Sequence, residues 1–151
     1  MDVNRSDFMA IALGEAQLAA ARGEVPVGAV IVRDGKVLAK AGNRTRELSD
    51  PTAHAEIVAI RAACAAEGAE RLNGADIYVT LEPCAMCAAA ISFARLRRLY
   101  FGASDPKGGG VLHGGRFFAQ PTCHHAPDIY PGLGETLSAE LLRDFFRERR
   151  D

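Results

Sequence analysis

The sequence predicts an α/β protein, a three-layer α/β/α sandwich around a five-stranded mixed sheet. Segments with strand and helix patterns alternate along the chain, and no internal repeat, linker or second core interrupts them. The length of 151 residues, with 48% hydrophobic and 25% charged residues, is typical of one globular domain. We therefore expect residues 1–151 to form a single domain, with helices on both faces of the sheet.

The first half of the chain contains two expected helices and one expected hairpin. Residues 7–22 place apolar side chains at helical intervals, which predicts a helix. Residues 28–32 and 36–39 are short strand-like runs joined by the pair Asp34-Gly35, which predicts a β-hairpin. Residues 53–67 are rich in alanine and end at a glycine, which predicts the second helix.

The second half supplies the remaining strands and helices. Residues 77–81 are β-branched and aromatic, which predicts a strand, and the alanine-rich residues 83–94 follow as a helix. Residues 99–101 read as a fourth strand, and we place the fifth near residues 128–132. The last expected helix covers residues 135–150.

Composition and charge exclude several classes of protein. Lys and Arg number 18 against 19 for Asp and Glu, so any nucleic acid would be held by a local patch rather than by a global positive field. Four cysteines are too few for a disulfide scaffold in a domain of this size, which favours a reducing compartment. The chain shows neither a signal-peptide pattern nor the ~20 consecutive apolar residues of a membrane span. We expect a soluble, cytoplasmic protein without a membrane partner.

Two short motifs carry the chemistry. His54-Ala55-Glu56 and Pro83-Cys84-Ala85-Met86-Cys87 each lie at an expected helix start. Backbone N–H groups are unpaired there and the helix dipole is positive, which favours the thiolate form of cysteine. One imidazole and two thiolates balance a divalent zinc and leave one tetrahedral position for water. We therefore predict that Zn²⁺ is bound by His54, Cys84 and Cys87.

Glu56 is the expected proton carrier at this zinc site. Water bound to zinc loses a proton near neutral pH, and a carboxylate beside it can take that proton and return it to a leaving nitrogen. Glu56 is more useful in that role than as a fourth ligand. The motifs therefore predict a hydrolytic enzyme.

Each motif alone has other interpretations. A Cys-x-x-Cys pair also occurs in structural zinc sites and in redox pairs. A structural site needs a fourth ligand, but none of the candidates sits in a second tight pair. The redox interpretation gives no role to residues 54–56. The candidate fourth ligands are Cys64, His113, Cys123, His124 and His125.

The order H-x-E followed by P-C-x-x-C is the signature of zinc-dependent nucleobase deaminases. The chain resembles the bacterial tRNA-specific adenosine deaminases well beyond this signature. The similar stretches run from the end of the first helix to the C-terminus: residues 24–30, 42–44, 50–57, 78–87, 101–103 and 144–147.

The resemblance implies a cytidine deaminase-like fold and a homodimer with one Zn²⁺ per subunit. It also implies conversion of adenosine to inosine at the wobble position of a tRNA anticodon stem-loop, with release of ammonia. Glu56 would protonate N1 of the adenine and then the leaving amino group. An anticodon loop is already unpaired, so extruding its base costs less than extruding one from a duplex.

The resemblance also implies a set of substrate-binding residues. Asn43 would hydrogen-bond the base, and the N–H of Ala55 would face the tetrahedral centre. The pocket wall would be lined by Val25, Pro26 and Val27. Neighbouring nucleotides would be contacted by Asp105 and Lys107, and the RNA backbone by Phe145, Phe146, Arg147, Arg149 and Arg150. Two alternatives stay open for the last group, because Phe145 or Phe146 can be core residues and C-terminal arginines complement a helix dipole.

Ser104, Pro106 and residues 111–125 depart from the family pattern. A deaminase of free bases or nucleotides, such as guanine, cytidine or deoxycytidylate, is the first alternative, and the near-neutral charge favours it. Asn43 and residues 144–150 oppose it. A noncatalytic RNA-binding protein that uses zinc for folding is the second alternative.

Overall fold

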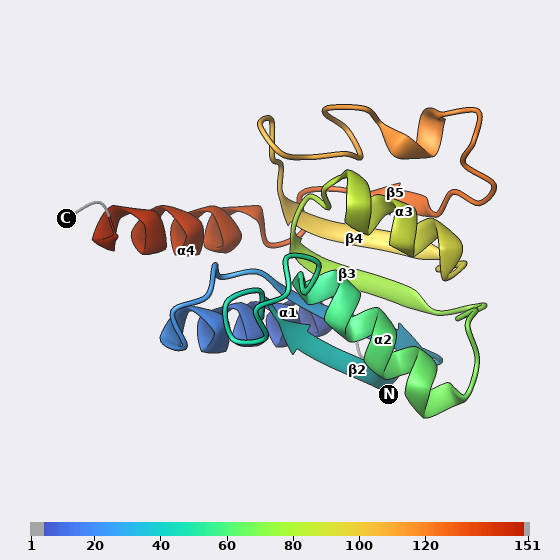
Figure 1. Cartoon of the computed structure of the whole chain (residues 1–151), viewed down its shortest axis with the longest axis horizontal. Coiled ribbons are helices and arrows are strands. Elements are labelled where there is room, and N and C mark those ends of the chain that lie inside the picture. Colours follow the sequence, from blue (N-terminus) through green and yellow to red (C-terminus); the bar gives the residue numbers. More distant parts are fainter. Residues whose placement is uncertain (1–4, 150–151) are drawn as a thin grey trace.

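A computed structural model describes residues 5–149 of the chain (Figure 1). The predicted helices and strands are all present, with small shifts at their ends. In chain order they are α1 (Arg5–Ala21), β1 (Gly28–Arg33), β2 (Lys36–Gly42), α2 (Ala55–Glu67), β3 (Asp76–Leu81), α3 (Ala85–Phe93), β4 (Arg98–Ala103), the 3₁₀ turn η1 (Phe117–Ala119), β5 (Asp128–Tyr130) and α4 (Glu135–Glu148).

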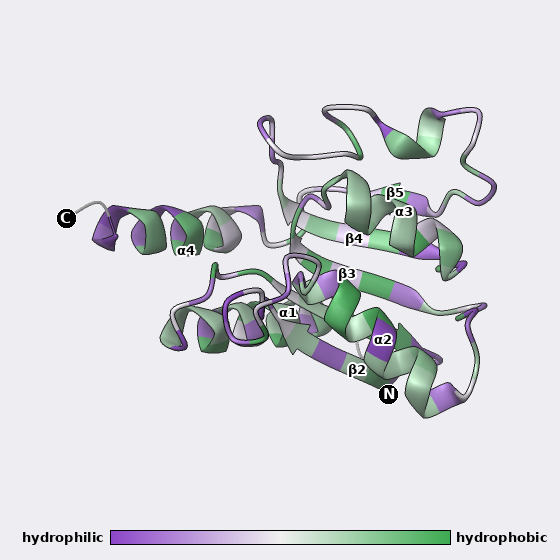
Figure 2. Ribbon diagram, viewed as in Figure 1, coloured by the Kyte–Doolittle hydropathy of each residue, from purple (hydrophilic) through white to green (hydrophobic). Residues whose placement is uncertain are grey.

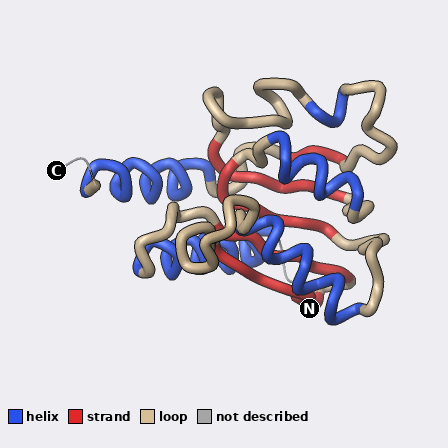
Figure 3. The backbone as a smooth tube through the Cα atoms, viewed as in Figure 1, coloured by secondary structure: helices blue, strands red, loops and turns tan. Residues whose placement is uncertain are grey.

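The five strands form one mixed sheet in the order β2-β1-β3-β4-β5 (Figure 3). β1 runs antiparallel to both β2 and β3, whereas β3, β4 and β5 run parallel to one another. In the β1–β2 hairpin the predicted turn residues Asp34 and Gly35 have φ angles of 51° and 75°. Positive φ at both positions is what a two-residue turn of type I′ requires.

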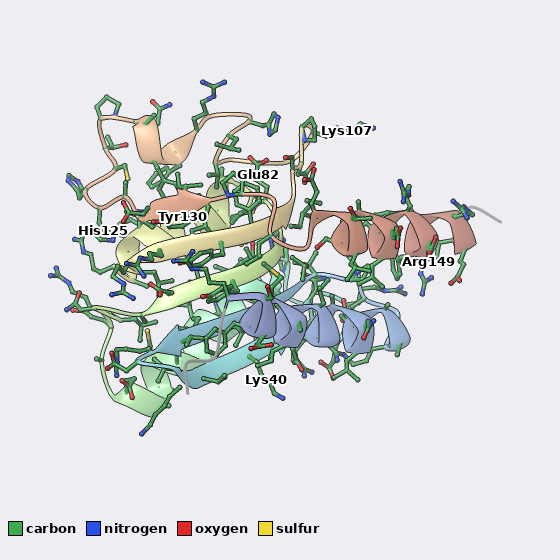
Figure 4. All side chains as sticks on the ribbon, turned by 180° about the vertical axis from the view of Figure 1, so that it is seen from behind. Lys40, Glu82, Lys107, His125, Tyr130 and Arg149 are labelled. Atoms are coloured by element: carbon green, nitrogen blue, oxygen red, sulfur yellow. The ribbon has the colours of Figure 1, made fainter. Side chains whose placement is uncertain are left out.

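Helices cover both faces of the sheet, which confirms the three-layer prediction. α2 and α3 lie on one face, and α1 and α4 lie on the other (Figures 1 and 4). Successive strand residues point to opposite faces. In β3, Val79 therefore joins the core beneath α2 and α3, while Tyr78 packs with Phe8 of α1.

The last helix extends past the end of the sheet (Figure 1). It packs against β4 and α1. Polar and apolar bands alternate along it, whereas β3 and β4 are mainly apolar (Figure 2). Among the described residues, no helix is both long and apolar enough to cross a membrane.

The glycine-rich segment after β4 is an extended loop with the single turn η1, which packs against α3 (Figure 3). Phe117 lies partly buried against the core beneath α3. The Cys123 thiol donates a hydrogen bond to the carbonyl oxygen of His125, and the His125 ring lies 2.7 Å from the carbonyl oxygen of Leu96. The second contact holds the loop against the segment between α3 and β4.

Two of the shifted element ends bear on the pocket. α2 begins at Ala55 rather than at residue 53, because His54 has extended backbone angles (φ −68°, ψ 155°) and takes the position before the helix. β2 continues to Gly42 rather than residue 39, because it stays paired with β1 until Gly28. Both shifts bring pocket residues to the ends of regular elements.

Candidate active site

Three possible metal ligands converge where two helices begin. Nδ1 of His54 lies 3.6 Å from the sulfur of Cys84 and 3.4 Å from that of Cys87. All three ligand atoms lie within 4.8 Å of one another. Within residues 5–149, no other cluster of His, Cys, Asp or Glu has three members suited to a metal ion, and no fourth residue joins this one.

The local backbone explains why these side chains are available. His54 precedes α2 and Cys84 precedes α3, and neither side chain caps its helix. Both can therefore turn toward a ligand. Cys87 lies in the first turn of α3, where a spacing of three residues returns a side chain to the same side as Cys84. Unpaired N–H groups and the positive helix ends favour negative charge at this point.

The donor set fits zinc. Tetrahedral zinc with bonds of about 2.3 Å to sulfur and about 2.0 to 2.1 Å to nitrogen holds those two donor atoms about 3.6 Å apart. The two nitrogen–sulfur distances in the protein are 3.6 Å and 3.4 Å. One imidazole and two sulfurs are also ligands that zinc prefers. The side chains are thus already placed for a zinc ion.

The charges within the cluster favour a thiolate at Cys84. A hydrogen bond from Cys87 lowers the pKa of Cys84 to about 4. That hydrogen bond, together with burial, raises the pKa of Cys87. A hydrogen bond with Cys84 also raises the pKa of His54. A cation entering the cluster would therefore displace protons from Cys87 and His54, since metal ligands must be deprotonated.

Glu56 is buried beside the cluster. It lies in the first turn of α2, is only 4% exposed, and faces the same pocket as His54 and Cys84. Burial raises the pKa of its carboxyl above the ordinary value. A raised pKa favours the protonated form of the carboxyl, which suits general acid–base chemistry.

The cluster lies in a pocket of about 240 Å³. Pockets for drug-sized ligands span roughly 300 to 1,000 Å³, so this one suits a group about the size of a single base. Asn43 is 7% exposed at the wall, and its Nδ2 donates a 3.3 Å hydrogen bond to Oγ1 of Thr45. The lining residues are Val25, Val27, Asn43, Thr45, His54, Glu56, Leu81, Glu82, Cys84 and Asp105.

Three other residues expected at or near the pocket, Ala55, Pro26 and Lys107, differ in their burial. Ala55 is fully buried as the first residue of α2. Pro26 is buried and is not among the residues that line the pocket, although both of its neighbours are. Lys107 is exposed, and its backbone N–H donates to the carboxylate of Asp105 at 3.3 Å.

The residues of the C-terminal helix that were expected to contact RNA differ in their exposure. Phe146 is 46% exposed, and the Arg147 side chain is 74% exposed. Phe145 is only 7% exposed, and the guanidinium of Arg149 covers its ring at 3.7 Å from the centroid. Phe145 is therefore a packed residue, as the alternative interpretation allowed. Arg150 lies outside the described residues.

Sequence reasoning missed three pocket residues. Leu81 and Glu82 sit between the end of β3 and Pro83, and Thr45 follows Asn43 by two residues. The position of Leu81-Glu82 directly before the Pro-Cys-x-x-Cys motif was a usable signal, because the end of a strand that feeds a helix lies beside that helix start. Thr45 carried no such signal.

Comparison with known proteins identifies the protein family to which the chain belongs. Residues 2–103 match the family model described as "Cytidine and deoxycytidylate deaminase zinc-binding region". The chain therefore belongs to the zinc-binding deaminase family that this model defines, in agreement with the geometry of the His54, Cys84 and Cys87 cluster.

Within that class, the chain belongs to the tRNA-specific adenosine deaminases. It is 70% identical to the tRNA-specific adenosine deaminase of Agrobacterium fabrum over 97% of this chain and 96% of the relative. A solved structure from a study of A-to-I editing by tRNA:A34 deaminases at the wobble position has a TM-score of 0.90 and 70% identity. It covers 91% of this chain and 100% of that chain. A guanine deaminase structure from Bacillus subtilis is more distant, with a TM-score of 0.68, 32% identity, and coverage of 98% and 94%.

Proposed function

We propose that this protein converts adenosine to inosine at the wobble position of a tRNA anticodon by zinc-dependent hydrolysis, with release of ammonia. The single observation that carries the proposal is the convergence of His54, Cys84 and Cys87 beside the buried carboxyl of Glu56 in one base-sized pocket. The 70% identity to a tRNA-specific adenosine deaminase supports the choice of substrate. All of the chain would act as one deaminase domain in the cytoplasm, where its RNA substrate is found.

Zinc would be held by Nδ1 of His54 and the sulfurs of Cys84 and Cys87. When bound, it acts as a Lewis acid and lowers the pKa of water at the site, so that a nucleophile is present near neutral pH. One water is consumed and one ammonia leaves for each adenosine converted. The remaining steps depend on the protein's own side chains.

Glu56 would move the protons. Its carboxylate accepts a proton from the attacking water and delivers it to N1 of the adenine. It then accepts the second proton, from the hydroxyl group now on C6, and passes it to the leaving amino group, so that the C6 oxygen becomes the carbonyl of inosine. Burial raises the pKa of Glu56, and a higher pKa favours the protonated form that can donate to the leaving group. The N–H of Ala55 at the start of α2 would donate to the oxygen at the reacting carbon.

The pocket wall would hold the base, with Asn43 as its hydrogen-bonding partner and Val25 and Val27 as apolar contacts. All three line the pocket, which supports these roles. Pro26 would act by shaping the backbone between the two valines.

The RNA outside the pocket would meet two further regions. Asp105 and Lys107 lie on the loop after β4, at one side of the pocket. Exposed Phe146 and Arg147 lie on α4, where arginine can bind phosphate and an aromatic ring can stack on a base. Arg149, packed on Phe145, would support the helix end, and Arg150 would add a further phosphate contact.

The protein would act as a homodimer through the face formed by α2 and α3. A groove on that face is lined by Ile57, Ile60, Arg61, Glu70, Ala90, Phe93 and Ala94. Phe93 is 69% exposed, and together with Ile57, Ile60 and Ala90 it gives this groove a contiguous apolar lining that a partner would cover. Arg61 and Glu70 border the same groove with opposite charges, so a second copy related by two-fold symmetry can pair them reciprocally.

A deaminase of free purines is the second candidate, supported by the 32% identity to a guanine deaminase. One assay separates the two. The purified zinc-loaded protein is incubated with an anticodon stem-loop that carries a wobble adenosine, with the same stem-loop carrying guanosine there, and with free adenosine, guanine and cytidine. We expect inosine in the first RNA and no ammonia elsewhere. Ammonia from the free compounds alone would reject the proposal.

A further inference from the structure

Glu82 is a buried carboxylate with an unusual number of hydrogen-bond donors. It lies between β3 and α3 and is 2% exposed. Its Oε2 accepts from the backbone N–H groups of Val111, Leu112 and His113 at 3.2, 2.9 and 3.1 Å. Its Oε1 accepts from the N–H of Asp105 at 3.0 Å and lies 2.8 Å from Nδ1 of His113. One side chain thereby ties together both ends of the segment 105–113.

Two glycines let this segment approach closely. A Cβ at Gly109 would lie 2.5 Å from the Cδ of Glu82, and a Cβ at Gly110 would lie 2.6 Å from the backbone nitrogen of Ala85. The N–H of Gly110 also donates to the carbonyl oxygen of Pro83 at 2.8 Å. The glycine run therefore serves close packing against the turn that carries Cys84, not flexibility.

The held segment reaches the pocket at Asp105. Asp105 lines the pocket, and its Oδ1 accepts from the N–H groups of Lys107 and Gly108 at 3.3 and 2.9 Å. This turn places the exposed Lys107 at the outer end of the loop. Figure 4 shows Glu82 close to the loop that carries Lys107.

We infer that Glu82 is a positioning residue that fixes segment 105–113 in its substrate-binding shape before the RNA arrives. The inference rests on the proposed function and deepens it. A segment that must order itself on binding reduces affinity, because ordering costs entropy that a preformed surface does not lose. Glu82 therefore acts on recognition of the RNA, while the groups of the chemical step, Glu56 and His54, are supplied separately by α2 and the residue preceding it.

The test is Glu82→Gln in the full-length, zinc-loaded protein. The amide keeps one oxygen for the three N–H groups of residues 111–113 but turns an NH₂ group toward the N–H of Asp105. Loss of a hydrogen bond to a charged acceptor should speed amide hydrogen exchange in residues 105–113 about ten-fold or more. KM for the wobble stem-loop should rise about five-fold or more. We expect kcat to stay within about two-fold and zinc content to be unchanged.

Glu24→Gln is the matched control. Glu24 is also a buried carboxylate, 1% exposed, and it accepts from the backbone N–H groups of Arg46 and Glu47 at 3.1 and 2.8 Å. We expect faster exchange around residues 46 and 47 in this variant and no change in residues 105–113. The pair separates local anchoring from a general loss of stability.

Unchanged exchange in residues 105–113 would overturn the inference. So would faster exchange with an unchanged KM, or lost zinc or lower kcat at an unchanged KM. If Glu82→Gln does not fold, Gly109→Ala tests the same contact by pushing the segment away from an intact Glu82, with the same results expected. A wild-type protein that leaves the stem-loop unchanged would refute the proposed function, and the exchange comparison would still decide whether Glu82 holds the segment.

Discussion

The carboxyl of Glu56 owes its properties to where a single residue falls in α2. Two positions after His54, it points into the pocket yet is nearly shielded from water. Desolvation disfavours the charged carboxylate, so the pKa of Glu56 rises. At the surface, the same residue would be ionised throughout the physiological range and would be a poor acid.

Replacing Glu56 with glutamine should abolish turnover without loss of the fold. Glu56→Gln keeps the shape of the side chain but removes the group that moves protons, and general acid–base catalysis contributes about 10² to 10⁴ in rate. We expect kcat on the wobble stem-loop to fall at least about 100-fold while zinc content stays at the wild-type level. The exposed Glu135→Gln serves as the control. Activity in Glu56→Gln within about two-fold of wild type would contradict the assigned role.

A second residue-scale property belongs to the tyrosines on the other face of the sheet. Tyr78 stacks on Tyr100 with ring centroids 4.4 Å apart, and Tyr100 stacks on Tyr130 at 4.8 Å. Burial raises the pKa of Tyr78 to about 12. The folded protein therefore holds the neutral phenol in a pH range where the unfolded chain has ionised it.

This shift predicts a loss of stability at high pH. The unfolded tyrosine has a pKa near 10, so the contribution of Tyr78 is fully present below about pH 10 and declines as the pH rises through the folded value. By pH 12 the free energy of unfolding should fall by about 2 kcal/mol for this reason. Urea unfolding from pH 8 to 12 measures the effect. Tyr78→Phe should lack this component, whereas Tyr130→Phe, at a position 38% exposed in the wild type, should keep it. Identical pH profiles for wild type and Tyr78→Phe would contradict the prediction.

At the scale of elements, the sheet positions both halves of the active site. β2 ends at Gly42, directly before Asn43, and β3 ends at Leu81, directly before Glu82 and the cysteine motif. β2 lies next to β1, which pairs with β3. The loops leaving these strands therefore reach the same end of the sheet, where α2 and α3 begin.

The close packing of α1 against β1 depends on Gly28. A Cβ there would overlap the carbonyl oxygen of Ala12 and lie 2.7 Å from the nitrogen of Ala16. Gly28→Ala should lower the free energy of unfolding by about 2 kcal/mol or more, because overpacking forces the helix away from the strand. Gly14→Ala in α1 is the control. Its Cβ would meet no atom within 4 Å, so the alanine should raise stability by up to about 1 kcal/mol. Urea unfolding measures both, and equal stability of Gly28→Ala and wild type would refute the close contact.

For the whole molecule, the exposed groove between α2 and α3 is the face through which the proposed dimer would form. α2 and α3 each begin at a zinc-ligand position, so a partner bound to this face would also support the two helix starts. Formation of the proposed dimer would therefore help to hold the zinc ligands in place.

Phe93→Asp should convert the dimer to a monomer. A charge in the centre of an apolar interface loses the burial of the aromatic ring and adds a desolvation cost. Sedimentation velocity at micromolar concentration measures the result. Leu137→Asp on α4, at a position 57% exposed in the wild type, should remain dimeric and controls for added surface charge. A wild-type monomer, or a dimeric Phe93→Asp, would overturn the proposed interface.

The sequence by itself determined the helices, the strands and the metal-ligand set. Helix and strand periods are local, and so is the spacing of His54 to Glu56 and of Cys84 to Cys87, so these features can be identified along the chain without knowledge of distant contacts. The tertiary structure alone decided the strand order, the absence of Pro26 from the pocket lining and the burial of Phe145. It also decided the partners of Glu82, which lie 23 to 31 positions later in the chain. Such contacts depend on how separate elements pack, and no spacing rule within one element encodes them.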